Sequence, residues 1–570
     1  MSDMPRTLLV GSNIPQPTQV VATATADTNQ LIEINVILVR PTHQGLTLQQ
    51  YADAVIVNSK PILDHHVFES AYGIADADFD AVSAFAGSYG LTETWRSASA
   101  GYIKFQGTIG SVNAAFDIVL ETVNIGSRIY RSYQGEISVH ADVAPKILHV
   151  MGLDTYMTIV KHSRRYEPNI TAQTSAAKVN LSPTQVAGAY KFPSGNGQGS
   201  RVGIVEVGGG YIQSDLNSSF AIFGVTPPTI YEIPVNGGSN YGATGSASDE
   251  TMLDLVCCGG VAPGAVMCMY WGPEPGFSIS DALTSIYDTV NAAVADFIYT
   301  PSVISVSYGF GQNYWNAVSG LVASFEATFQ AGIAKGISIC VASGDDGAQG
   351  RADTAPSVGY PGGSPYCICV GGTSLQINGT IITSETVWNQ GNGGTGGGIT
   401  TFALPSYQTG LGLTATPYTT GPGIPQALTA RGAPDLAANS DPATGYLIIL
   451  NGFEYQYGGT SAAAPVIAGL IAIINANLKT RIGFINSQIY TNSAAFSDVT
   501  VGNNCCTGVQ STGWAATIGW DACTGMGSPI GTSIQALYQT APSTGAVYPN
   551  YLVGTRPSSG QTYPRPYITA

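Results

Sequence analysis

The stretch Gly459-Thr460-Ser461-Ala462-Ala463-Ala464-Pro465 runs directly into an apolar segment, Val466 to Leu478, and predicts a buried helix that begins at a glycine-rich turn. Ser461 is expected to be a small, exposed hydroxyl residue at the start of this helix. Backbone N–H groups are unpaired there and the positive helix end favours developing negative charge, which suits a nucleophile. The alternative is a serine that only caps a core helix, and the local sequence favours neither interpretation.

Length and charge limit the classes of protein. The 570 residues predict two domains, at least one of them with a large core. Acidic residues outnumber basic ones, 36 to 21, so we expect neither nucleic acid nor an anionic membrane as a partner. We expect no membrane span, and Met1 to Arg6 lack the apolar core of an ordinary signal peptide. From residue 166 onward, 10 basic residues accompany 21 acidic ones, so little positive self-repulsion develops in acid and acid tolerance is expected.

The first part of the chain predicts a compact α+β module. Residues 1–30 are polar and are expected to be loose, and residues 31–160 alternate between strand and helix patterns. This alternation resembles a ferredoxin-like fold. The expected strands are Ile32–Arg40, Tyr102–Gly107 and Arg128–Ser132, and the expected helices are Leu48–Asn58, Asp76–Tyr89, Ser111–Leu120 and Val143–Val150.

A polar, basic segment follows, at residues 161–177, and predicts an exposed linker. It is either a cleavable linker or an ordinary connection between domains. Residues 178–541 then predict a doubly wound α/β domain, because their short apolar runs suit parallel strands covered by helices on both faces. The expected strands are Arg201–Val207, Ala265–Trp271, Ser302–Ser307, Gly336–Val341 and Cys367–Val370, and the expected helices are Asp249–Cys258, Ile279–Tyr299 and Tyr314–Ala334. Residues 542–570 form a Tyr/Pro-rich tail, either extended or disordered.

The nine cysteines lack the spacing of a zinc site, and buried free thiols are expected. One disulfide among Cys505, Cys506 and Cys523 stays an open alternative.

The positions of the histidines restrict the chemistry available to Ser461. All six stand at positions 43, 65, 66, 140, 149 and 162, so the α/β domain contains none. Ser461 therefore cannot take a general base from an imidazole of its own domain. Either a histidine of the first domain or a carboxylate must serve.

Three acidic segments offer the carboxylates. Glu250 and Asp254 stand one helical turn apart, so they can share one proton, although such pairs are also common on helix surfaces. Asp345 directly follows an apolar strand, where its protonated form can donate a hydrogen bond to an oxyanion; the alternative is an ordinary Asp/Gly turn. Asp498 and Asp521, with nearby backbone carbonyls, suit Ca²⁺ or form an ordinary acidic loop.

Together these segments resemble the sedolisins, the serine-carboxyl peptidases of the subtilisin-like superfamily, and particularly the kumamolisin-like members. The resemblance extends from about residue 32 to residue 539. It rests on five motifs in order: Gly208-Gly209-Gly210-Tyr211, Glu250-x-x-x-Asp254, Ser343-Gly344-Asp345, Gly459-Thr460-Ser461-x-x-x-Pro465, and Asp498-Val499 with Gly519-Trp520-Asp521.

The resemblance implies the role of each residue. Ser461 would be the acylated nucleophile, Glu250 its general base and acid, Asp254 the partner of Glu250, and Asp345 the oxyanion donor. One Ca²⁺ per subunit would be bound by the side chains of Asp498 and Asp521 and the backbone carbonyls of Val499, Thr517 and Gly519. Thr517 departs from a glycine frequent in the family, which matters only if this position needs a positive φ.

The resemblance also implies an acid-active endopeptidase made as a zymogen. Protein or peptide substrates would be its partners, its own prodomain would be an intramolecular inhibitor, and autocatalytic cleavage would fall within His162–Ala177. We expect a monomer in an extracellular or acidic compartment. Two alternatives are a non-catalytic binding or structural protein on a peptidase-like scaffold, and a subtilase that uses a prodomain histidine.

Overall fold

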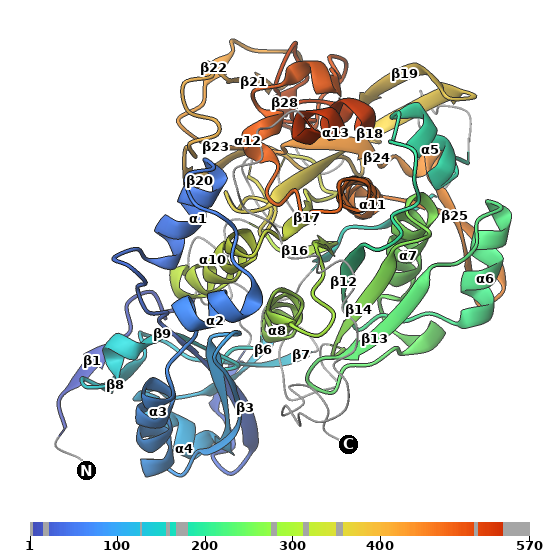
Figure 1. Cartoon of the computed structure of the whole chain (residues 1–570). Helices are drawn as coiled ribbons and strands as arrows, with labels where there is room; N and C mark the ends of the chain where they lie inside the picture. The colour runs from blue at the N-terminus through green and yellow to red at the C-terminus, as the bar shows by residue number, and fades with distance from the viewer. Residues whose placement is uncertain are drawn as a thin grey trace.

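The computed structural model describes residues 4–14, 22–125, 128–155, 160–166, 180–274, 282–311, 318–348, 357–506 and 511–539. Figure 1 shows a smaller N-terminal module, in blue and cyan, packed against a larger α/β unit that runs from green to red. The tail predicted at residues 542–570 lies outside the described residues.

The N-terminal module is built on an antiparallel sheet of order β4-β5-β3-β9. The chain runs strand, helices, strand, strand, helix, strand through this sheet, the ferredoxin-like arrangement. Its elements are β3 (Leu31–Leu38), α1 (Leu48–Ile56), α2 (His65–Tyr72), α3 (Asp76–Ser88), β4 (Thr92–Ser97), β5 (Tyr102–Thr108), α4 (Ile109–Phe116) and β9 (Ile147–Met151).

The alternation along β3 places its residues on the two different faces of this sheet. Ile32, Ile34 and Val36 point into the core of the module, whereas Ile37 joins the core of the larger unit. Such a strand is buried on both sides only while the two parts stay docked.

Two predictions for this module are wrong. The segment predicted as a helix at Val143–Val150 is a single 3-10 turn, Ala144–Lys146, followed by β9, because pairing with β3 satisfies its backbone better than one isolated helical turn. The first 30 residues are not uniformly loose: β1 (Arg6–Leu8) pairs with β8 (Ser138–His140), and β2 (Ala22–Thr25) pairs with β6 (Glu121–Ile125). β6 also pairs with β7 (Arg128–Ser132).

The larger unit is a doubly wound α/β domain, as the sequence predicts. Its main sheet has the order β13-β14-β12-β15-β17-β18-β19, with β24 on β18, and every pair except β18–β19 is parallel. The strands are β12 (Arg201–Val207), β13 (Thr229–Pro234), β14 (Val266–Gly272), β15 (Val303–Val306), β17 (Ser338–Ala342), β18 (Ile368–Asn378), β19 (Ile381–Val387) and β24 (Leu436–Asn439).

Four long helices cover this sheet: α7 (Ser248–Val261) and α11 (Thr460–Leu478) pack together on one face, and α8 (Ala282–Ala295) and α10 (Ser319–Ala334) on the other (Figure 1). By length and composition alone α11 could cross a membrane, but 83% of its most apolar window is buried inside the protein. Its apolar composition is therefore that of a central core helix.

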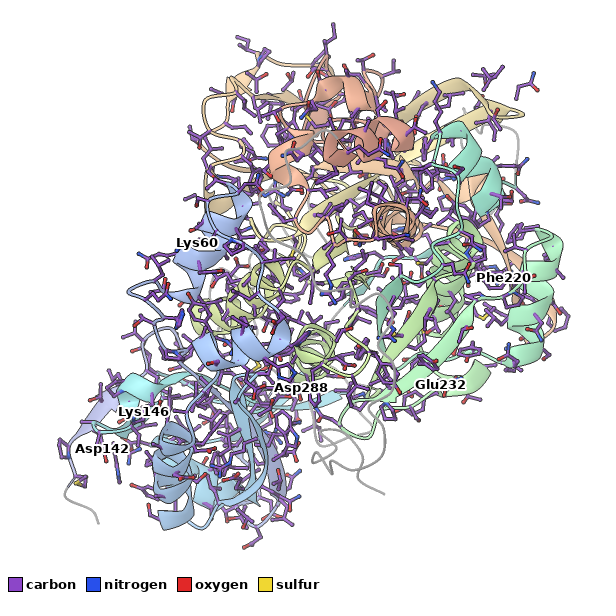
Figure 2. The ribbon with its side chains drawn as sticks, in the orientation of Figure 1. Lys60, Asp142, Lys146, Phe220, Glu232 and Asp288 are labelled. Carbon is purple, nitrogen blue, oxygen red and sulfur yellow. The ribbon has the colours of Figure 1, made fainter. Side chains whose placement is uncertain are left out.

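The N-terminal module docks on α8 through one buried charge cluster. Asp288, labelled in Figure 2, comes from α8, and its side chain is fully buried. The Asn35 side-chain amide of β3 donates to Asp288 Oδ1 at 2.6 Å, and Lys104 Nζ of β5 lies 2.9 Å from Asp288 Oδ2. A buried charge of this kind is stable only while its partners remain, so the cluster ties the module to the larger unit.

The segment between the two parts is not an exposed linker over its described residues, 160–166. β10 (Val160–Lys161) pairs with β16 (Tyr308–Gly309), and β11 (Arg164–Arg165) pairs with β26 (Phe453–Gly458), which itself pairs with β25 (Tyr446–Leu450). The backbone of the linker thus finds partners on the surface of the larger unit, which the composition of the segment alone did not reveal. Residues 167–177 of the predicted linker lie outside the described residues.

All nine cysteines are buried free thiols, so the alternative of a disulfide among Cys505, Cys506 and Cys523 is not realised.

Candidate active site

Ser461 is the second residue of α11, directly after a turn that only glycine permits. Gly459 has φ +108°, and a Cβ there would lie 2.2 Å from the His162 carbonyl oxygen and 2.6 Å from Asp345 Oδ2. The turn therefore brings the helix start close to both groups. Ser461 is fully buried rather than exposed, because the linker covers it; its Oγ donates to the carbonyl of Ser307 at 3.4 Å.

Glu250 and Asp254 lie one turn apart on α7, and both are fully buried. Burial raises the pKa of Glu250 to about 7, and the nearby hydroxyls of Ser163 and Ser461 oppose this rise. Among the described residues neither oxygen of Glu250 has a hydrogen bond of standard length and angle. Such a carboxyl is poised to exchange a proton with the serine beside it.

Asp254 is held by Ser307, which directly follows β15. Ser307 Oγ lies 3.0 Å and 2.8 Å from the two carboxyl oxygens of Asp254, within hydrogen-bond distance of both. Burial first, and then the charges of Glu206 and Glu250, raise the pKa of Asp254 well above its ordinary value. Asp254 is therefore the member of the pair that stays protonated when Glu250 is ionised.

Glu206 is a third buried carboxyl that our reading of the sequence missed. It lies near the end of the apolar strand β12, and its Oε2 accepts hydrogen bonds from Thr251 Oγ1 and the Tyr308 hydroxyl, both at 2.9 Å. Burial and the charge of Glu250 raise its pKa well above the ordinary value. A signal was present: a lone acid within the run Val202–Val207 is costly unless its proton or charge is used.

The glycine motif after β12 explains how these carboxyls come together. A Cβ on Gly209 would lie 2.1 Å from Thr251 Oγ1, the hydroxyl that binds Glu206. The missing side chain lets α7 approach the end of β12, so that Glu206, Glu250 and Asp254 form one buried group.

Asp345 follows β17 and faces the start of α11. Thr460 donates to Asp345 Oδ1 twice, from its backbone N–H at 2.8 Å and from its hydroxyl at 2.9 Å. Asp345 Oδ2 has no hydrogen bond among the described residues, although Arg164 Nε of the linker lies 3.9 Å away. Burial raises the pKa of Asp345 well above its ordinary value, and Arg164 and Thr460 oppose the rise.

The linker passes directly through this group of residues. His162 N–H donates to the carbonyl of Ser307 at 3.1 Å, and Ser461 N–H donates to the carbonyl of His162 at 2.9 Å. The peptide bond between His162 and Ser163 therefore lies against Ser461 with its carbonyl oxygen on a helix-start N–H group. The hydrogen bond that Ser461 Oγ donates goes to the Ser307 carbonyl and not to a histidine ring.

Hydrogen bonds join the side chains of Asp498 and Asp521, two of the five residues predicted to bind a metal, to the loop of residues 517–521. Asp498 Oδ2 accepts from Gly519 N–H at 2.8 Å, and Asp521 Oδ2 accepts from Thr517 N–H at 3.2 Å. Burial raises the pKa of Asp521 to about 7, opposed by the N–H groups of this loop. Val499 is buried beside Asp498, and Thr517 is not among the residues of positive φ, so threonine is tolerated there.

The fold and this constellation define a serine-type peptidase: a subtilisin-like parallel sheet carries a serine at a helix start, within a shell of buried carboxyls and without a histidine of its own domain. The chain matches the Pro-kumamolisin activation domain over residues 18–156 and the subtilase family over residues 240–501.

Relatives that match most of the chain identify the family more narrowly. The chain is 35% identical to kumamolisin of Bacillus sp. (strain MN-32), over 94% of this chain and 97% of that protein. It is 29% identical to sedolisin of Pseudomonas sp. (strain 101), over 82% and 80%. A solved structure of Pseudomonas sedolisin, a serine-carboxyl proteinase complexed with two molecules of pseudo-iodotyrostatin, has a TM-score of 0.56 and 27% identity, over 64% of this chain and 100% of that one. The chain belongs to the sedolisin family, with an N-terminal activation domain.

Proposed function

We propose that this protein is an acid-active endopeptidase made as a zymogen, and that it first cleaves its own His162–Ser163 bond through an acyl-enzyme on Ser461. One observation carries the proposal: the His162 carbonyl accepts the Ser461 N–H at 2.9 Å while the linker is strand-paired on both sides of this bond. That is the position of a bound substrate rather than of a passing loop. No observation favours the non-catalytic alternative.

The proposed reaction uses the residues in sequence. Ser461 Oγ attacks the carbonyl carbon of His162 and its proton passes to Glu250, while Asp254 keeps its own proton. The negative oxygen is stabilised by Ser461 N–H and by protonated Asp345. As the C–N bond breaks, Glu250 returns the proton to the amine of Ser163, and water then hydrolyses the ester by the reverse transfers.

Acid is required because two protonation states must coexist. Asp345 donates only when neutral, which its raised pKa favours as the pH falls. Glu250 must be ionised to accept the serine proton, and its pKa of about 7 opposes this as the pH falls, so the reactive molecules are those in which both states occur together. Arg164 stabilises the ionised form of Asp345 in the zymogen and so opposes cleavage at neutral pH. The linker covers Ser461 until then, so we propose that the activation domain with its linker is an intramolecular inhibitor.

The N-terminus produced in acid tests this proposal. After incubation of the full chain at about pH 4, where ordinary Asp and Glu side chains are near half-protonation, the first new N-terminus is expected at Ser163. N-terminal sequencing over a time course separates it from later trimming. A first cut elsewhere, with the His162–Ser163 bond intact, would contradict the assignment of the scissile bond.

We also propose one Ca²⁺ site at Asp498 and Asp521, with the backbone carbonyls of Val499, Thr517 and Gly519. Two carboxylates and backbone carbonyls are hard oxygen ligands of the kind that Ca²⁺ takes. A cation would favour the ionised form of the buried Asp521, whose pKa is raised to about 7 without one. The ion would tie the loop of residues 517–521 to Asp498, a structural rather than a chemical role.

Removal of Ca²⁺ is expected to lower the melting temperature. Loss of an ion present at a hundred times its dissociation constant costs about 2.7 kcal/mol of stability. Thermal unfolding with excess EDTA, and again after Ca²⁺ is restored, measures this change; Asp521→Asn should melt at the EDTA temperature and respond to neither. Equal melting temperatures with and without EDTA would contradict the proposed Ca²⁺ site.

The remaining proposals concern the substrates, the oligomeric state and the compartment. Substrates would be proteins or peptides that replace the linker as an extended strand, the protein would act as a monomer, and an extracellular or acidic compartment would suit its acid chemistry.

A further inference from the structure

The linker carries three basic side chains, and each one has a partner in the cleft. Lys161 Nζ pairs with both oxygens of Asp249, at 2.6 Å from Oδ2. On the other side of the His162–Ser163 bond, Arg164 Nη2 lies 2.5 Å from Asp346 Oδ1 and Nη1 lies 3.2 Å from the Asn392 carbonyl. The Arg165 guanidinium lies over the ring of Tyr455, 4.1 Å from its centre.

These contacts are separate from those that hold the backbone. The strand pairing of β10 and β11 uses only N–H and C=O groups, which any sequence except proline can supply. The ion pairs are therefore what distinguishes one side chain from another at the residue before His162 and at the residue after Ser163, the P2 and P2′ positions.

Each of the two carboxylates stands directly beside a proposed catalytic residue in the sequence. Asp249 precedes Glu250 in the first turn of α7, where its Oδ1 accepts the Glu250 N–H at 3.0 Å. Asp346 follows Asp345 after the end of β17. Their side chains are 20% and 12% exposed, so each contact is partly shielded from water.

Departure of the linker leaves both carboxylates without a cation. Among the described residues, Lys161 is the only ion-pair partner of Asp249 and Arg164 the only one of Asp346. The cleft then presents two negative groups, one on each side of the position of the scissile bond, and a substrate with matching cations restores both pairs.

We propose that Asp249 and Asp346 make this peptidase selective for Lys or Arg at P2 and at P2′, so that its substrates are peptides with basic residues three positions apart across the cleaved bond. This inference rests on the proposed function. The chain itself fits it: from residue 166 onward no two of its basic residues stand three apart, so the processed domain contains no such site of its own.

A panel of four peptides tests the proposal with the acid-processed protein. The parent has the sequence of residues 157–168; the others carry Gln in place of Lys161, of Arg164, or of both. Each contact is a partly buried, charge-assisted pair, so kcat/KM at about pH 5 is expected to fall about fivefold to tenfold for each replacement.

Two variants assign each preference to its residue. Asp249→Asn should cleave peptides with Lys or Gln at P2 at equal kcat/KM and keep the preference for Arg at P2′. Asp346→Asn should lose the preference for Arg at P2′ and keep the preference for Lys at P2. Glu454→Gln is the matched control, because Glu454 is an exposed acid of β26 with no recorded ion pair or hydrogen bond to residues 160–166; it should keep both preferences.

The outcomes separate this inference from the proposed function. If the unmodified enzyme cleaves all four peptides at equal kcat/KM, and Ser461→Ala cleaves none, the proposed peptidase activity is supported and the proposed selectivity is contradicted. If Asp249→Asn keeps the P2 preference, the assignment to Asp249 falls. If the unmodified enzyme cleaves no peptide, the proposed peptidase activity and the proposed selectivity are both contradicted. The panel with the unmodified enzyme is decisive even if a variant fails to process.

Discussion

Ser461→Ala is expected to keep the chain at full length in acid and to abolish cleavage of added substrates. Without Oγ no acyl-enzyme forms, and loss of the nucleophile from a serine peptidase lowers kcat on the order of 10⁶-fold. The fold should persist, because the hydrogen bond that Oγ donates to the Ser307 carbonyl is long, at 3.4 Å. Gel analysis of chain length and hydrolysis of a denatured protein at about pH 4, where Asp345 can be neutral, measure the two effects.

Two controls separate chemistry from folding in this experiment. Ser324→Ala removes another buried helical hydroxyl, which donates to the Gly320 carbonyl at 2.9 Å, and should process at the unmodified rate. Processed wild-type enzyme added in trans should still cut the Ser461→Ala chain, if acid exposes its linker. Self-processing of Ser461→Ala at a rate independent of concentration would rule out Ser461 as the nucleophile.

Asp345→Ala should lower kcat by roughly 10²–10³ and leave KM nearly unchanged, because it removes a donor that acts on the oxyanion. Asp345→Asn is the more informative variant. The two donors of Thr460 fix Oδ1 as an acceptor, so the introduced asparagine is expected to place its amide N–H groups where Oδ2 now stands.

The two variants should differ in their dependence on pH. The pKa of Asp345 is raised by burial, so its neutral, donating form is present below that pKa and is lost as the pH rises through it. The amide introduced by Asp345→Asn donates at every pH. The alkaline limb of kcat/KM should therefore move upward in this variant, until ionisation of another group becomes limiting. An unchanged alkaline limb would show that protonation of Asp345 does not set it.

Much of the main fold could be predicted because its strands are short runs buried on both faces and its helices are long and apolar. β12 matches its predicted bounds, and α7, α10 and α11 were expected within a few residues of where they begin or end. Predictions failed where the pairing partners are distant in sequence. The segment of β9 has a helical pattern, but it forms a strand because it pairs with β3. β1 and β2 are ordered by strands about a hundred residues or more away in the sequence.

The same division applies to the candidate site. Glu250 and Asp254 could be paired from their spacing, since one helical turn places both on one face. Glu206 could not be added to them, because the contact depends on how closely α7 approaches β12 past Gly209. Asp345 could be placed at a strand end, but its position against Thr460 follows from the packing of α11 on the sheet.

By itself the sequence determined that a serine stands at the predicted start of a helix in a domain without histidine, and that paired and isolated acids are present in that domain. These properties follow from residue identity and short-range periodicity. Only the tertiary structure decided which peptide bond meets that serine. The composition of residues 160–166 predicts an exposed segment, but their backbone groups and basic side chains are satisfied by β16, β26, Asp249 and Asp346. Those partners come from four separate parts of the chain, and only folding brings them to one cleft.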